Sequence, residues 1–148
     1  MKSLVVYDSN FGNTKQLAEV IAEVLTGKAI SINDFKSNDL SGIDLLVVGS
    51  PINAWRATPK IQSFLSGLKA KKMNAAAFDT RIKVFFSGNA AKRIGKSLVA
   101  AGAELITPPL AFYVKEKEGP LADGEIEKAK SWANHLKTIN KNHAVKNP

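Results

Sequence analysis

The 148-residue chain contains no cysteine, which excludes disulfides, thiol catalysis and cysteine-ligated metals. It also lacks a long apolar run near its start: only residues 4–7 are continuously apolar there, too few for a signal or membrane segment. Its two histidines, His135 and His143, stand without other metal-ligand residue types around them, so no metal site is indicated. No repeat or low-complexity tract is present. We therefore expect a cytoplasmic globular protein.

Length and composition favour one domain. A chain of this size can bury a single core, and its hydrophobic content of 45% and charged content of 23% are ordinary for globular proteins. We expect the domain to span residues 1–140 and a polar C-terminal tail to cover residues 141–148.

The net charge of +8 is concentrated in the middle of the chain. Residues 51–114 contain ten cationic and two acidic side chains, whereas residues 1–50 carry slightly more acids than bases. A basic surface attracts acidic proteins, anionic cofactors or nucleic acid, although a solvated surface without a partner is the simpler interpretation. The basic residues are not interleaved with aromatics in a recognisable nucleic-acid module, so no specific nucleic-acid role is expected.

Strand and helix patterns alternate along the chain, which predicts an α/β protein with a parallel sheet covered by helices on both faces. Pro108 and Pro109 cannot donate ladder hydrogen bonds, so the last strand should lie at an edge. Strands are expected at residues 4–7, 29–32, 45–48, 75–79 and 105–114, with a loop over 80–88.

The turn between the first strand and the first helix has the character of an anion site. The first backbone N–H groups of a helix have no internal partners and sit at the positive end of its dipole. The turn has no lysine, so it is not a nucleoside-triphosphate P-loop, nor is it a dinucleotide G-x-G-x-x-G turn. An ordinary capped turn is the alternative. The candidate residues are Ser9, Asn10, Phe11, Gly12, Asn13 and Thr14.

Ser-x-Phe-Gly-Asn-Thr directly after the first strand resembles the phosphate-binding loop of the flavodoxin family, which holds the FMN phosphate without a cationic side chain. The resemblance implies a three-layer sandwich whose five-stranded parallel sheet has the order 2-1-3-4-5, with FMN at the point where the strand order reverses.

A second loop continues the resemblance. Gly49-Ser50-Pro51 opens it, an aromatic residue follows, and Thr58-Pro59 begins a helix. In the family this loop lies against the flavin, and the resemblance makes Trp55 the stacking candidate; the alternative is that Trp55 packs as core. The implied flavin-binding residues are Pro51, Ile52, Asn53, Ala54 and Trp55.

The third loop departs from the family pattern of a Gly-Asp pair and a stacking Tyr. Arg81 replaces a small or acidic residue, and either Phe85 or Phe86 could cover the outer ring face; both could be buried if the segment is a strand. Asp79, Thr80, Arg81, Phe85 and Phe86 complete the candidate cofactor-binding set. Arg56, Arg81 and Lys83 crowd this region, and a cation near the ring would favour the reduced, anionic flavin, which predicts a less reducing carrier than the acidic flavodoxins.

The resemblance therefore implies an FMN-binding protein that transfers electrons to or from a protein partner, and the basic middle of the chain leads us to expect an acidic docking surface on that partner. No catalytic residue is assigned. One alternative is an FMN-dependent oxidoreductase acting on a quinone or porphyrin-type substrate. A second alternative is a flavodoxin-like binding module that holds no flavin.

Overall fold

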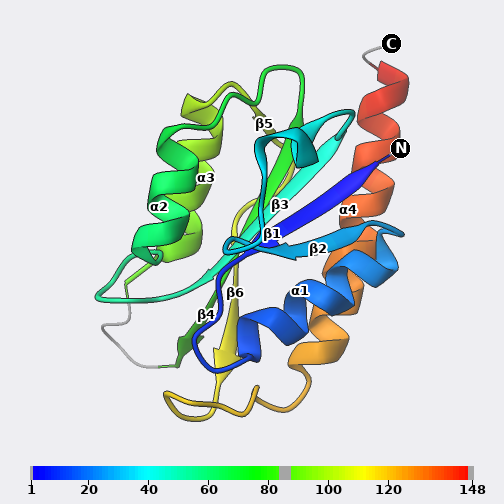
Figure 1. Ribbon diagram of the computed structural model, residues 1–148. Coiled ribbons are helices and arrows are strands. Elements are labelled where there is room, and N and C mark those ends of the chain that lie inside the picture. Colours follow the sequence, from blue (N-terminus) through cyan, green and yellow to red (C-terminus); the bar gives the residue numbers. More distant parts are fainter. Residues whose placement is uncertain (1, 84–87, 147–148) are drawn as a thin grey trace.

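The computed structural model describes residues 2–83 and 88–146, with side chains as far as residue 141. It has three layers (Figure 1). A central sheet is covered on one face by α1 (Asn13–Val24) and α4 (Glu125–Lys146), and on the other by α2 (Pro59–Ser66) and α3 (Ala90–Ala100). A short 3₁₀ helix, η1 (Ser37–Leu40), precedes the third strand.

The sheet is parallel throughout and has the order β2-β1-β3-β4-β5, with β6 also paired to β4. The flavodoxin-like α/β fold predicted above is confirmed. The strands are β1 (Ser3–Tyr7), β2 (Lys28–Ser31), β3 (Leu45–Pro51), β4 (Asn74–Ile82), β5 (Glu104–Leu105) and β6 (Leu110–Val114).

The predicted loop over 80–88 is wrong at its start, because β4 continues to Ile82. The second half of β4 is paired on both sides: Thr80 pairs with Pro51 of β3 and with Phe112 of β6. Pairing with β6, a segment distant in the chain, stabilises this extension, and a local pattern does not reveal such a contact. Phe85 and Phe86 lie outside the described residues.

The predicted strand over 105–114 is divided into β5 and β6, which occupy the same edge of the sheet beside successive parts of β4. The break contains Pro108 and Pro109, which have no N–H to donate to the ladder. At the other end of the chain, α4 continues to Lys146, past the predicted start of a tail. Its Asn140 is buried and accepts a 2.7 Å hydrogen bond from Nδ2 of Asn74.

The strands are apolar on both sides because each face of the sheet is covered by helices. Successive residues of β1 alternate between the two cores: Leu4 and Val6 pack toward α2 and α3, and Val5 and Tyr7 toward α1 and α4. On β3, Gly49 has no side chain to offer, and a Cβ there would enter the ring of the fully buried Phe78. The space beside Gly49 is thus occupied by the Phe78 ring.

The two helical layers differ in charge. Helices α2 and α3 contain four cationic side chains, Lys60, Lys92, Arg93 and Lys96, and no acidic one. Helices α1 and α4 carry both signs. The two basic helices of the middle of the sequence therefore lie together on one face of the sheet (Figure 1). Among the described residues, no helix combines the length and apolar character needed to cross a membrane.

Candidate functional site

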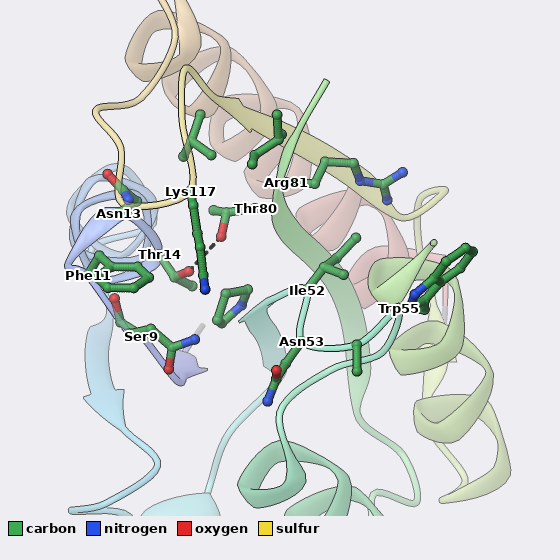
Figure 2. Close-up of a pocket in the computed structure, with 15 residues that line it drawn as sticks. Ser9, Phe11, Asn13, Thr14, Ile52, Asn53, Trp55, Thr80, Arg81 and Lys117 are labelled. Atoms are coloured by element: carbon green, nitrogen blue, oxygen red, sulfur yellow. Dashed lines mark hydrogen bonds between the residues drawn. The ribbon is translucent and has the colours of Figure 1, made fainter. Parts of the chain in front are cut away.

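A cavity of about 300 Å³ opens at the carboxyl ends of β1, β3 and β4 (Figure 2). It brings together every predicted site residue except Gly12, Asp79 and the undescribed Phe85 and Phe86. The lining also includes Ile82, Val114 and Lys117, which the sequence analysis did not select. The full lining is Ser9, Asn10, Phe11, Asn13, Thr14, Pro51, Ile52, Asn53, Ala54, Trp55, Thr80, Arg81, Ile82, Val114 and Lys117.

The start of α1 forms one wall. Gly12 adopts a left-handed conformation with φ of 92°, which turns the chain from β1 into the helix. The Ser9 hydroxyl accepts hydrogen bonds from the N–H groups of Gly12 (3.0 Å) and Lys15 (3.3 Å). Within the described chain, the N–H groups of Asn13 and Thr14 have no acceptor. These two donors, at the positive end of the helix, are available to an anion.

Thr14 connects this wall to the sheet. Its buried hydroxyl lies 2.9 Å from the hydroxyl of Thr80 on β4. The segment predicted as a separate third loop is therefore joined, through the extension of β4, to the turn at α1.

The second loop presents Trp55 on a strained turn. The backbones of Asn53 and Arg56 exchange two hydrogen bonds, 2.6 and 3.1 Å long, around Ala54 and Trp55. Both central residues have positive φ, 49° and 74°, a conformation that usually requires glycine or asparagine. Such strain clusters at functional sites. The Trp55 side chain is 57% exposed, so the alternative that it packs as core is wrong.

Arg81 lines the cavity, but its charge is paired with a carboxylate. Its guanidinium forms a two-pronged contact with the fully buried carboxylate of Asp79, with Nε at 2.9 Å, and this hydrogen bonding raises the Arg81 pKa above its usual value. Asp79 also accepts the N–H of Ala91 at the start of α3 (2.8 Å), and Arg81 donates to Asn89 (3.1 Å). The Arg81 charge is balanced by Asp79, so of the three cations on which the redox expectation rests, Arg56, Arg81 and Lys83, Arg81 is not a free charge.

Lys117 is the cation that the sequence analysis missed. It comes from the loop between β6 and α4 and points into the cavity (Figure 2). The sequence analysis placed no candidate site residue in this loop. The position of the loop over the cavity depends on a contact between residues about a hundred positions apart, and no local sequence motif indicates it.

The sheet order, and the cavity at the point where that order reverses, define a flavodoxin-like protein. The sequence matches the family model described as a flavodoxin domain over residues 4–104, and the chain belongs to the flavodoxin family. A search of curated proteins finds no match.

Solved structures with the same fold include a flavodoxin from the domain Archaea, 24% identical with a TM-score of 0.83, where the match covers 95% of this chain and 99% of that one. Oxidised flavodoxin 1 from Bacillus cereus is 18% identical, with a TM-score of 0.79 and coverages of 93% and 98%. Rubredoxin oxygen:oxidoreductase from Desulfovibrio gigas is 22% identical with a TM-score of 0.79; the match covers 95% of this chain but 36% of that one.

In the described part of this chain, no group of three or more His, Asp or Glu side chains is arranged to hold a metal ion.

Proposed function

We propose that the protein binds FMN non-covalently and transfers electrons to or from a protein partner. The observation that carries this proposal is one cavity with two unpartnered N–H donors at one wall, on Asn13 and Thr14, and the exposed Trp55 at another. When bound, FMN supplies the redox chemistry through its ring, and the chain supplies binding and orientation.

The residues present fit a phosphorylated aromatic ligand. The N–H groups of Asn13 and Thr14 would hold the phosphate, because a helix N-terminus with free donors favours an anion. The apolar lining residues Ile52 and Ile82 would exclude water from the ring, and Trp55 offers a flat surface for stacking. The backbone turn that carries Trp55 is already formed without a ligand, so stacking costs little backbone freedom.

A partner with an acidic surface is supported by the charge of the α2–α3 layer. Between residues 51 and 103 there are ten cationic side chains and one acidic, Asp79, which is buried against Arg81. Arg56 follows Trp55 directly and lines a groove of about 380 Å³ between α2 and α3, together with Arg93. The basic side therefore begins at the rim of the cavity, where an electron-transfer partner must approach.

Titration of the purified protein with FMN tests the cofactor. We expect 1:1 binding, quenched flavin fluorescence and retention of the bound absorption bands after gel filtration. A folded protein that retains no FMN would overturn the proposal and favour the flavin-free binding module. Catalytic turnover of a quinone with a nicotinamide donor would instead favour the oxidoreductase alternative.

Small inorganic acceptors test the charge of the docking side. The reduced protein should reduce ferricyanide, an anion, at a rate that falls with added salt, and hexaammineruthenium(III), a cation, at a rate that rises. Arg93→Glu should weaken both salt dependences, whereas Lys137→Glu on the exposed face of α4 should change them little. Equal effects of the two substitutions would contradict docking on the α2–α3 side.

A further inference from the structure

The loop between β6 and α4 is closed by its own backbone. The N–H of Gly119 donates to Glu116 O, and the N–H of Lys115 donates to Pro120 O, both at 2.9 Å. The N–H of Ala122 donates to Tyr113 O of β6 at 2.8 Å. Residue 117 therefore lies at the tip of a loop whose two ends are tied together.

The same loop is fastened to the first residue of α1. Nδ2 of Asn13 donates to Glu118 O at 3.2 Å. Gly119, with φ of +107°, packs so closely against Asn13 that a Cβ on it would lie 2.6 Å from Oδ1. The position of Lys117 relative to the start of α1 is thus set by the two residues that follow it, Glu118 and Gly119.

The charge of Lys117 is unbalanced, although acidic residues precede and follow it. Among the described residues, neither Glu116 nor Glu118 nor any other carboxylate forms an ion pair with its ammonium group. By contrast, the nearby Lys115 pairs with Asp123 at 3.3 Å. The other cation lining the cavity, Arg81, is held by Asp79.

The ammonium end of Lys117 lies well away from Trp55 and on the side of the cavity where Phe11, Asn13 and Thr14 are found (Figure 2). A phosphate held by the N–H groups of Asn13 and Thr14 would lie on this side, and the stacked ring on the other. An ammonium group and a phosphate form a strong charge-assisted contact.

We propose that Lys117 binds the phosphate of FMN, so that this chain completes its phosphate site with a cation supplied by a distant loop. The inference rests on the proposed function. It follows from the anchoring of the loop to Asn13, the unpaired ammonium group and the separation of that group from Trp55.

The test compares the dissociation constants of FMN and riboflavin, which differ by the phosphate. In wild-type protein FMN should bind more tightly than riboflavin. Lys117→Gln should weaken FMN binding by about 10- to 100-fold, the range expected for one charge-assisted contact, and leave riboflavin binding within about twofold. Lys115→Gln is the matched control: it makes the same charge change in the same loop and should affect neither ligand by more than about twofold.

Inorganic phosphate provides a readout without a flavin. Calorimetry or amide shifts of Asn13 and Thr14 should detect phosphate binding to the wild-type apoprotein, and Lys117→Gln should weaken it. An equal loss of FMN and riboflavin affinity would place Lys117 at the ring and overturn the inference, as would unchanged FMN affinity. If wild-type protein binds neither flavin, it is the proposed function that fails.

Discussion

The hydroxyl oxygens of Thr14 and Thr80 lie 2.9 Å apart in the interior, one at the start of α1 and the other on β4. This contact joins two segments separated by 66 positions in the chain. It fixes the turn at the start of α1 against the strand that forms the opposite wall of the cavity. The geometry of the site therefore depends on a buried polar pair as well as on the loops.

Replacing Thr80 by valine should lower the free energy of unfolding by about 1–2 kcal/mol, because the buried Thr14 hydroxyl loses its partner while the shape is kept. Chemical denaturation measures the change. Thr80→Ser retains the hydroxyl and should recover most of the hydrogen-bond contribution. A valine variant as stable as the wild type would show that the hydroxyl pair contributes nothing.

Replacing Arg81 by methionine should lower the free energy of unfolding by about 2–4 kcal/mol, since it leaves the fully buried carboxylate of Asp79 without its cation. The double variant Arg81→Met with Asp79→Asn should be more stable than Arg81→Met alone, because no unpaired charge remains. The two denaturation midpoints check this order, and the reverse order would contradict it.

Replacing Trp55 by alanine should weaken FMN binding by about 5- to 30-fold, the equivalent of about 1–2 kcal/mol of stacking. Because the side chain is 57% exposed, the free energy of unfolding of the apoprotein should change by less than about 0.5 kcal/mol. Trp55→Phe keeps a flat ring and should retain most of the affinity. Fluorescence titration and denaturation separate the two effects; an apoprotein destabilised by several kcal/mol would indicate a core role.

Tyr7 predicts a loss of stability at alkaline pH. Burial raises the pKa of its hydroxyl above the ordinary value of 10.0, and the negative charges of Glu19 and Asp34 add to the shift. The folded state therefore holds the proton more tightly than the unfolded state, so stability falls as the pH rises from about 10 through the folded-state pKa. Tyr7→Phe should remove this part of the loss.

The measurement for Tyr7 is the difference in unfolding free energy between Tyr7→Phe and wild type at several pH values. It should be constant below pH 10 and then increase in favour of the variant. Deprotonation of the lysines affects both proteins alike and cancels. In a Glu19→Gln background the increase should be smaller, and a constant difference up to pH 12 would contradict the shift.

The sequence predicted the fold because its local patterns agree with the tertiary structure. The apolar run of β1, the turn at Gly12 and the Thr58-Pro59 helix start each follow from short-range chemistry, and Thr58 accepts the N–H of Ile61 as an N-cap does. The predictions were wrong where distant segments decide the conformation. β4 extends to Ile82 because β6 pairs with it.

The candidate site was predicted to a similar extent and for the same reason. The turn at residues 9–14 and the Trp55 loop are contiguous motifs, and both line the cavity. Two features could not be read from the sequence. Asp79 and Arg81 are two residues apart, but their pairing depends on the position of α3, and Lys117 enters the cavity because its loop is fastened to Asn13.

Helices α2 and α3 together carry a net charge of +4 and helices α1 and α4 a net charge of +2, so the net positive charge of the helical layers is displaced toward α2 and α3. A molecule with such a dipole moment rotates in an external field instead of only drifting in it. On a negatively charged electrode it should adsorb with the α2–α3 side, and with it Arg56 and the rim at Trp55, facing the metal. Charge placement in one layer thus selects the orientation of the whole molecule before any contact is made.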